Sequence, residues 1–242
     1  MIVTLSDINP LKSFIDLVYD SATTIKLVFS RDGLNINLLN NSHVCFYNAN
    51  FQVDYFDLYD VDDYEEIVVD AKDLYLILKS AKNSDILTID FEEDNVRFIF
   101  ESNGKRRNFT LSLIDELYNS PTPPSIDYDV DFVMDWSDLK QTTMDLDKIV
   151  GTDRFSITLN DTGVFVKSPA DAMTYYNNQI STEAFDYTLS STVNLDYMSI
   201  LTKLSRIGDL HLRIGNSIPV SWSVNGDSVE YTGLIAPILE ED

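Results

Sequence analysis

The sequence has little of several residue types on which disulfide-rich folds and many enzymes depend. Its 242 residues include one cysteine, Cys45, which excludes an internal disulfide framework and fits a reducing compartment. The eight glycines are not clustered, so no glycine-rich phosphate loop is present. There are two histidines, His43 and His211, and neither a His-Glu-His metal spacing nor a Cys-x-x-Cys pair occurs. These absences give an enzymatic function little support.

Long apolar runs are also missing. No stretch approaches the roughly 18 apolar residues needed to span a bilayer. The N-terminal Met-Ile-Val-Thr-Leu-Ser-Asp lacks the basic region and apolar run of a signal peptide. We therefore expect a soluble intracellular protein without membrane contacts.

Basic residues are scarce: 17 Lys and Arg stand against 40 Asp and Glu, for a net charge of −23. Phosphate binding depends on Lys and Arg, so this composition argues against a broad basic DNA-binding face. Either the protein does not contact nucleic acid, or its few basic residues are concentrated at one surface.

What the chain does contain is 44% hydrophobic residues, enough for one large or two medium cores, and a proline-rich stretch at mid-chain. Residues 118–128 hold three prolines in four positions and few apolar side chains, which predicts a semi-rigid exposed connector. We expect an N-terminal domain over residues 1–117 and a C-terminal domain over residues 129–242.

Both halves show the same order of elements. The apolar spacing predicts helices from Asn9, with Pro10 at its first position, to Val18, and over 71–82, 137–150 and 194–204. Asn9 and Asn194 are the predicted caps of two of these helices. Alternating segments predict strands in the first half at 25–29, 34–38, 42–55, 66–70, 86–91, 95–101 and 105–113, with an acidic loop or short strand at 57–66. In the second half they predict strands at 128–134, 154–160, 163–167, 173–180, 184–189, 211–214, 220–224 and 228–234.

Local matches support an internal duplication. At an offset of 124 residues Lys79 matches Lys203 and Lys82 matches Arg206, and at an offset of 130 Gly33 matches Gly163. The fold class is therefore α+β, with two similar domains that each pack two helices on antiparallel sheet.

Eight basic residues fall on the four predicted helices or at their ends, although these helices make up about a fifth of the chain. Polar helix faces often carry Lys, but the repetition of these positions between the halves favours a local basic track for nucleic-acid backbone. The candidate DNA-facing residues are Lys12, Lys72, Lys79, Lys82, Lys140, Lys148, Lys203 and Arg206.

Two enzymatic alternatives are weaker. His43 lies near Cys45, as in a Cys/His nucleophile pair, but no third group orients them and both positions are more typical of strand packing. The acidic residues between Asp57 and Glu66 include Asp60 and Asp62 but lack the glycine and ligand spacing of a calcium loop, so a solvated loop is favoured.

Three segments of the sequence resemble segments of one protein family. The run Arg31-Asp-Gly-Leu-Asn-Ile-Asn-Leu-Leu-Asn-Asn-Ser-His-Val44 resembles the strand, glycine turn, strand and Ser-His-Val segment of PCNA-type DNA sliding clamps. The end of the chain, Gly233-Leu-Ile-Ala-Pro-Ile-Leu-Glu-Glu-Asp242, is similar to the Leu-Ala-Pro signature and acidic tail of these clamps. Gly215-Asn-Ser-Ile-Pro219 is similar to the turn that precedes it.

The resemblance implies a non-enzymatic, ring-forming protein without cofactor or metal. Such a ring, usually a homotrimer, encircles double-stranded DNA and tethers DNA polymerase and other replication and repair enzymes after a clamp loader places it. The eight basic residues would then face the DNA without sequence preference.

The resemblance also implies a pocket for a short hydrophobic and aromatic motif of client proteins. By position this client-binding pocket comprises Leu39, His43, Val44, Pro123, Pro124, Ile126, Pro219, Leu234, Ala236 and Pro237. The connector usually offers aliphatic residues in the family, and Leu234 stands where an aromatic is common, so client preference is expected to differ.

Subunits of the family join edge to edge, which implies an interface between residues 105–113 of one copy and about 173–180 of the next. The interface residues are Lys105, Arg107, Phe109, Leu111, Tyr175, Tyr176 and Ile180. The basic run at 105–107 either discourages unwanted pairing or steers a partner edge.

Three hypotheses remain open, in order of preference. The first is a sliding clamp at replicating DNA. The second is an acidic protein-interaction module or DNA mimic that binds partners without encircling DNA. The third is a hydrolase that uses the acidic loop.

Overall fold

The computed structural model describes residues 1–61, 63–92, 94–115 and 121–239. Contacts divide the chain into two compact units. Unit 1 comprises Met1–Pro123 together with two later segments, Lys203–Ile207 and Asn225–Tyr231. The remaining residues form unit 2. The sequence did not predict that these two late segments belong with the first half.

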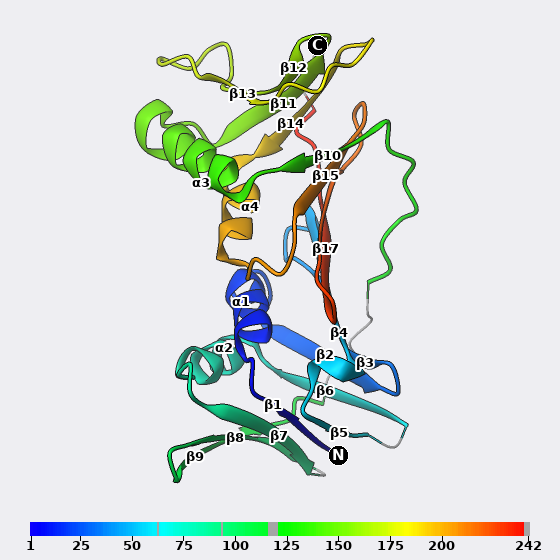
Figure 1. The fold of residues 1–242 in the computed structure, drawn as a ribbon, viewed down its shortest axis with the longest axis vertical. Helices are drawn as coiled ribbons and strands as arrows, with labels where there is room; N and C mark the ends of the chain where they lie inside the picture. Colours follow the sequence, from blue (N-terminus) through cyan, green and yellow to red (C-terminus); the bar gives the residue numbers. More distant parts are fainter. Residues whose placement is uncertain (62, 93, 116–120, 240–242) are drawn as a thin grey trace. The chain divides into compact units, whose positions relative to one another are not determined.

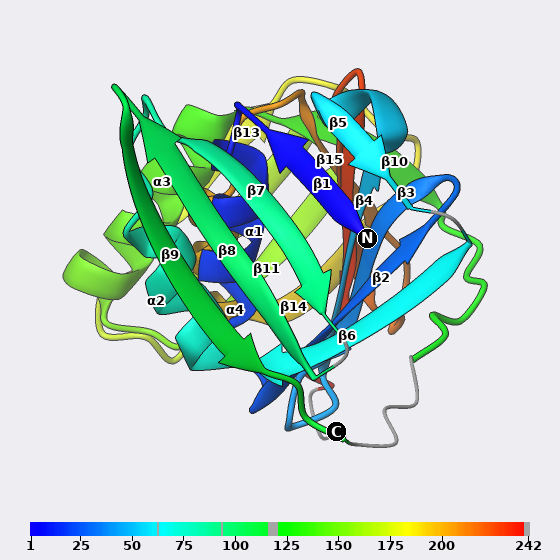
Figure 2. The same ribbon diagram turned by 90° about the horizontal axis from the view of Figure 1, so that it is seen from below.

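Unit 1 contains two antiparallel sheet regions and two helices (Figure 1). Its elements are β1 (Ile2–Leu5), α1 (Asn9–Val18), β2 (Thr24–Ser30), β3 (Gly33–Leu39), β4 (Cys45–Gln52), the 3₁₀ turn η1 (Val53–Tyr55), β5 (Leu58–Asp60), β6 (Tyr64–Asp70), α2 (Ala71–Lys79), β7 (Ile86–Glu92), β8 (Asn95–Ser102) and β9 (Lys105–Ser112). The strands are ordered β5-β1-β7-β8-β9 in one region, seen face-on in Figure 2, and β4-β3-β2-β6 in the other.

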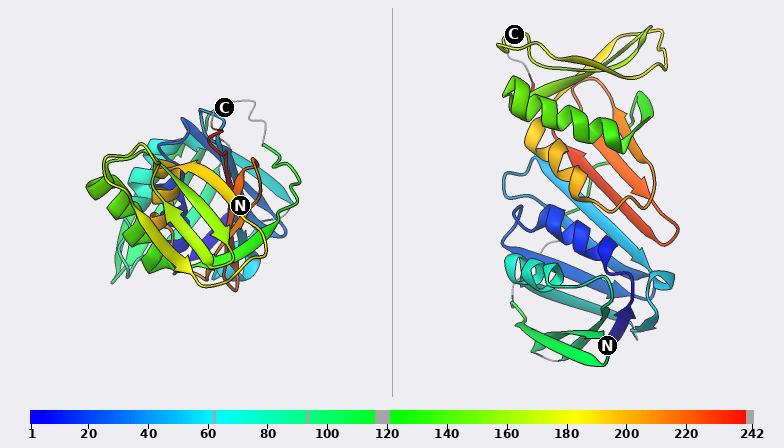
Figure 3. Two further views of the ribbon diagram at one scale, coloured as in Figure 1. Left: turned by 90° about the horizontal axis from the view of Figure 1, so that it is seen from above. Right: turned by 60° about the vertical axis from the view of Figure 1, so that its left-hand side comes forward.

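Unit 2 repeats this plan. Its elements are β10 (Val130–Met134), α3 (Trp136–Asp145), the π-helical turn η2 (Leu146–Val150), β11 (Arg154–Asn160), β12 (Gly163–Lys167), β13 (Asn177–Ser181), β14 (Leu189–Asn194), α4 (Leu195–Ser199), the 3₁₀ turn η3 (Ile200–Lys203), β15 (Leu210–Ile214), β16 (Val220–Asn225) and β17 (Val229–Ile235), with the last residue of η3 and of β16 and the first three of β17 counted in unit 1. The strand orders are β10-β15-β16-β17 and β13-β12-β11-β14. The two helices α3 and α4 lie side by side (Figure 3, right).

The predicted duplication includes equivalent glycines at two turns. Gly33 and Gly163 open β3 and β12 with positive φ values of 128° and 145°. An added Cβ would lie 2.0 Å from the carbonyl oxygen of Phe51 and 2.2 Å from that of Ser181, respectively. Only glycine fits such a close approach to a neighbouring strand, so both positions carry the same constraint.

Side-chain caps and apolar spacing explain the helices. Asn194 accepts a hydrogen bond from the Asp196 amide at 2.8 Å, which confirms the predicted cap, and Asp70, which was not predicted as a cap, accepts one from the Asp73 amide at 2.9 Å. The expected cap at Asn9 is wrong, because Asn9 is the first helical residue and Ile8 precedes it without a side-chain cap bond. Here Pro10 fixes the first turn.

Other expected boundaries are also wrong. Helix α2 ends at Lys79, so Lys82 does not share a helical face with it. The strand expected over 173–180 begins at Asn177, and residues 184–188 of the strand expected over 184–189 form a loop, since β14 begins only at Leu189. The α3 pattern breaks at the π-helical turn, where the Gly151 amide bonds to the Leu146 carbonyl at 2.9 Å.

The two late segments are held in unit 1 by specific contacts. The Ser13 and Ser205 hydroxyls are 2.8 Å apart, and the Ser205 amide donates to Ser13 Oγ at 3.0 Å. The buried Tyr231 ring stacks on Phe14 with 5.7 Å between ring centres. In the described residues no helix has the length and apolar character needed to cross a membrane.

Candidate nucleic-acid interface

Six of the eight candidate DNA-facing residues lie in unit 1, although the sequence assigned four of them to the N-terminal half. Lys12 lies on α1, Lys72 and Lys79 lie on α2, and Lys82 lies in the loop that follows α2. Lys203 and Arg206 join them, since the segment Lys203–Ile207 packs in unit 1. The other two, Lys140 and Lys148, lie on α3 and η2 of unit 2.

The lysines that the duplication matches, Lys79 and Lys203, are both ordered by neighbours. Lys79 Nζ donates to the Tyr75 hydroxyl at 2.7 Å and lies 5.0 Å from the centre of its ring. The bond to this hydroxyl is the main reason why the pKa of Lys79 is raised. Lys203 Nζ lies 3.2 Å from the Asp16 carboxylate, and it donates to the Asp16 carbonyl at 3.0 Å.

The remaining candidates differ in how much of their charge is neutralised. Lys12 donates to the Ala81 carbonyl at 3.2 Å, and Lys148 pairs with Asp147 at 2.7 Å. Four of the eight candidate side chains have no polar partner among the described residues, and three of these four belong to unit 1: Lys72, Lys82 and Arg206, with Lys140 in unit 2. Unit 1 therefore contains both lysines with polar partners and basic side chains without one.

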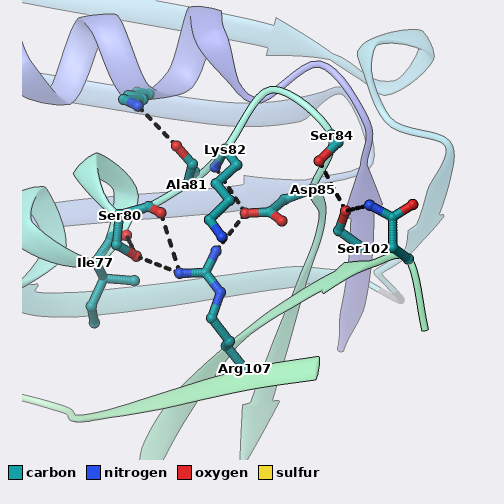
Figure 4. A network of polar contacts seen from close by, with 10 residues as sticks. Ile77, Ser80, Ala81, Lys82, Ser84, Asp85, Ser102 and Arg107 are labelled. Atoms are coloured by element: carbon teal, nitrogen blue, oxygen red, sulfur yellow. Dashed lines mark hydrogen bonds and ion pairs between the residues drawn. The ribbon is translucent and has the colours of Figure 1, made fainter. Parts of the chain in front are cut away.

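Behind Lys82 a buried carboxylate organises the loop (Figure 4). Asp85 accepts the Lys82 amide at 2.8 Å and the Arg107 guanidinium at 2.5 Å. Arg107 also donates to the carbonyl of Ser80, which caps α2, at 3.2 Å. This network joins the end of α2 to strand β9.

Strands β9 and β13 end their sheets in the described part of the chain. On β9, Lys105 is exposed, whereas Arg107, Phe109 and Leu111 are partly buried. On β13, Ile180 is partly exposed. Each strand offers an unpaired edge that could accept a further strand.

Two of the expected interface residues lie outside the strand in which the sequence places them. Tyr175 is 65% exposed and Tyr176 is held by Ser168, whose hydroxyl accepts the Tyr176 amide at 2.9 Å. Both precede β13 in a loop. Both tyrosines therefore lie next to the start of β13, but they do not lengthen its unpaired edge.

The expected client-binding residues are divided between the units. Leu39, His43 and Val44 lie at the β3–β4 turn of unit 1, where Asn40 Oδ1 accepts the Val44 amide at 2.9 Å. His43 has a positive φ of 59° and lies in this turn, not in a strand as expected. Pro123 is the last residue of the first segment of unit 1.

The unit 2 members are Pro124, Ile126, Pro219, Leu234, Ala236 and Pro237. Pro237 lines a groove of about 300 Å³ together with Ile238, the exposed Leu239 and the hydroxyl-bearing residues Ser156, Ser190, Ser191, Thr192 and Ser217. The Ile238 amide donates to the Thr192 carbonyl at 2.7 Å, so the C-terminal segment lies along the edge of β14.

The enzymatic alternatives find no support in the geometry. Cys45 is fully buried, and burial raises the pKa of its thiol to about 12, which leaves almost no thiolate near neutral pH. Within the described residues, which omit Asp62, no three Asp, Glu, His or Cys side chains are grouped to hold a metal ion.

Sequence reasoning missed Tyr19 and Tyr75, which contact the matched lysines. Tyr75 precedes Lys79 by four residues on α2, and this spacing brings side chains together on a helix. That signal was available in the sequence. The contact of Lys203 with Asp16 and Tyr19 was not, because it joins residues 187 and 184 positions apart.

Comparisons with known proteins agree on one family. Residues 3–118 match the family model of the proliferating cell nuclear antigen (PCNA), N-terminal domain. The DNA polymerase sliding clamp of Methanothermobacter thermautotrophicus is 25% identical over 241 residues, covering 98% of each chain. The proliferating cell nuclear antigen of Caenorhabditis elegans is 24% identical over 256 residues, covering 98% of this chain and 97% of its own.

A solved structure shows the same fold. The crystal structure of the proliferating cell nuclear antigen of Entamoeba histolytica superimposes with a TM-score of 0.87 at 19% identity and covers 98% of each chain. Sliding clamps of this family are non-enzymatic scaffolds. These findings confirm the resemblance found in the sequence: the chain has the α+β fold and the function of a PCNA-type DNA sliding clamp.

Proposed function

We propose that three copies of this chain close into a ring around double-stranded DNA inside the cell. The observation that carries this proposal is the repeated strand order. By the repeat β17 corresponds to β9, and β4 corresponds to β13. Both β9 and β13 end their sheets in the described part of the chain, so each subunit has one free edge of each kind.

The chain itself contains a precedent for pairing these edges. Within unit 1 the segment Asn225–Tyr231, which includes the start of β17, contacts the end of β4, where the Gln52 amide donates to the Ser228 carbonyl at 2.9 Å. The same kind of pairing between β9 of one copy and β13 of the next is heterologous, and such contacts generate a ring when the rotation closes. We therefore assign Lys105, Arg107, Phe109, Leu111, Tyr175, Tyr176 and Ile180 to the interface or its border.

A charge placed on the edge tests this assignment. We expect Ile180→Asp to lower the mass measured by light scattering from three chains to one at micromolar concentration. Thr182→Asp is the matched control, since it adds the same charge just beyond β13 and should leave the mass at three chains. A threefold mass for Ile180→Asp, or a monomeric unmodified protein, would contradict the proposed ring.

We further assign the eight basic residues to exchangeable contacts with the DNA backbone. Six of them gather in unit 1 of a chain with net charge −23. Positive residues concentrated in one part of an acidic protein suit contact with phosphates there and repulsion elsewhere. The ring would tether DNA polymerase and other clients, and a clamp loader would place it on DNA.

Polymerase processivity on primed DNA tests the DNA contacts. We expect Lys79→Glu and Lys203→Glu to shorten the products, since each reverses a charge near the phosphates. Arg31→Glu is the control, because Arg31 lies in the turn between β2 and β3, on none of the helices, and its exposed side chain pairs with Asp63. Normal products from both lysine variants would overturn the DNA-contact assignment.

For clients we assign the expected pocket residues, with the groove at Pro237 as the portion that unit 2 supplies. Its exposed Leu239 and partly buried Ile238 offer apolar contact, and its hydroxyl groups offer hydrogen bonds to an extended peptide. We expect Leu239→Ala to weaken binding of a polymerase-derived peptide several-fold in a fluorescence titration. Unchanged binding would remove this groove from the client site.

A further inference from the structure

Two tyrosines form a stack that joins α1 to α2 in unit 1. Tyr19 caps the C-terminal end of α1, and Tyr75 lies in the middle of α2. Their ring centres are 3.7 Å apart and the ring planes differ by 3°. Neither ring belongs to the buried core, and both are partly exposed. The stack therefore lies where the helices meet solvent.

Each ring of this stack holds one lysine. Lys79 Nζ lies 5.0 Å from the centre of the Tyr75 ring, and Lys203 Nζ lies 5.5 Å from the centre of the Tyr19 ring. Both distances are within the range of cation–π attraction. The Tyr75 hydroxyl and the Asp16 carboxylate hold the same two ammonium groups in addition.

These contacts to the ammonium groups matter because a lysine side chain is flexible. A free lysine loses considerable rotamer freedom when it binds a phosphate, and this loss opposes binding. Here the rings and hydrogen bonds have already restricted Lys79 and Lys203. The two ammonium groups lie no more than about 14 Å apart along the stack, since the three ring and cation separations limit them. Duplex DNA carries a phosphate about every 3.4 Å of helix axis on each strand, so two ammonium groups within this upper limit are close enough to contact phosphates of one strand.

We propose that Tyr19 and Tyr75 are positioning residues that hold Lys79 and Lys203 ready for neighbouring phosphates of one DNA strand. The inference rests on the proposed function, in which this helix surface meets DNA. It adds that two uncharged side chains determine the strength of the contact. The ligand class is a run of backbone phosphates, read without regard to base sequence.

The test uses a short DNA duplex and fluorescence anisotropy at several salt concentrations. We expect Lys79→Gln to reduce the magnitude of the slope of log affinity against log salt by about 0.9, the value for one lost phosphate contact. Tyr75→Leu should weaken binding about three- to tenfold, because Lys79 loses both its ring and its hydroxyl partner. Tyr75→Phe keeps the ring and should lie between Tyr75→Leu and the unmodified protein.

Non-additivity separates a positioning role from a structural one. If Tyr75 acts through Lys79, Tyr75→Leu should add no further loss in the Lys79→Gln background. Tyr64→Phe is the matched control, because it removes an exposed hydroxyl on β6 that bonds to Glu66. This control should bind DNA normally.

The possible failures are distinguishable. An additive loss in the double variant, or normal binding by Tyr75→Leu, would overturn the positioning role while the lysine contacts stand. If Lys79→Gln and Lys203→Gln both leave the salt slope unchanged, the proposed DNA contacts of this surface fail as well. NMR titration of labelled lysine gives an independent readout: Tyr75→Phe should return the raised pKa of Lys79 towards its ordinary value.

Discussion

The ion pair between Asp85 and Arg107 is expected to be the strongest single polar contact that holds β9 to the end of α2. Only 3% of the Asp85 side chain is exposed, against 35% of Arg107. The carboxylate accepts both the guanidinium and the Lys82 amide, whereas the guanidinium also reaches the Ser80 carbonyl (Figure 4). Removing one member leaves the other partly or wholly buried without its partner.

The magnitude follows from this burial. Breaking a buried pair by removing one partner costs about 3–5 kcal/mol, and the partial hydration of Arg107 reduces that figure. We expect Asp85→Ala to lower the free energy of unfolding by about 3 kcal/mol, since the Lys82 amide loses its acceptor as well. Arg107→Met should cost about 2–3 kcal/mol because it strands the buried carboxylate. A coupling energy of about 2 kcal/mol is expected from the double-variant cycle.

The same hairpin supplies a control. Glu101 and Arg106 are neighbours across β8 and β9, and they form an ion pair at 3.4 Å with 56% and 57% of their side chains exposed. An exposed pair contributes about 0–1 kcal/mol, so Glu101→Gln should change stability little. The comparison isolates burial, since both pairs join a carboxylate to an arginine of β9.

Urea unfolding at one protein concentration measures these values. Both tryptophans, Trp136 and Trp222, lie in unit 2, so their fluorescence follows that unit, whereas circular dichroism follows both. If the units unfold independently, Asp85→Ala should shift only the dichroism transition. A coupling energy below about 0.5 kcal/mol, or an equal loss in Glu101→Gln, would refute the role assigned to burial.

Two further predictions concern backbone geometry and the buried thiol. Gly33→Ala and Gly163→Ala should each lower the free energy of unfolding by about 3 kcal/mol or more, because the new methyl group meets a carbonyl of the neighbouring strand. Gly104 has a φ of 71° and open space around it, so Gly104→Ala should lower the free energy of unfolding by only about 1–2 kcal/mol. Equal losses at all three positions would contradict the steric argument. For Cys45 the folded pKa of about 12 exceeds the ordinary value of 9.0, so its contribution is complete below pH 9 and is lost as the pH rises towards 12. Stability measured from pH 9 upward should therefore fall more steeply than in Cys45→Ala, by up to about 1.4 kcal/mol per pH unit, and parallel curves would refute it.

Much of the fold could be predicted because its signals are local. Apolar residues at helical spacing marked the buried face of α2, and the paired glycines marked equivalent turns. The strand expected over 184–189 failed because alternating aromatic residues there serve a loop. The Phe185 amide donates to the Asn160 carbonyl, and its ring packs edge-on to Tyr187. Alternation alone does not distinguish such a loop from a strand.

Register explains another limit. The asparagines of β3 and β4 alternate with apolar residues, which predicts strands but not a contact among them. Pairing places Asn35 opposite Asn50 and Asn37 opposite Asn48. The four side-chain amides then form a closed cycle of hydrogen bonds in which each donates to the next. This cycle depends on the register between two strands, which no single segment encodes.

The residues of the candidate DNA surface could be predicted from the sequence, but the packing that brings them together could not. Helical spacing singled out Lys79 and Lys203 in separate halves. The structure brings Lys203 to α1 through Asp16, a contact across 187 positions that only tertiary packing determines. Similarly, regular helical spacing would place Ile149 on one side with the buried Leu146, whereas Ile149 is 67% exposed in the π-helical turn.

The acidic composition also bears on how the proposed contacts would behave during sliding. Lys203 and Lys148 already pair with the carboxylates of Asp16 and Asp147. A phosphate that approaches either lysine exchanges one anion for another, so the net gain is smaller than for a lysine without a partner. Non-specific phosphate contacts of this kind form and break readily as the DNA moves. We therefore infer that the excess of acid on this chain keeps the proposed DNA contacts weak, while closure of the ring, not their strength, retains the DNA.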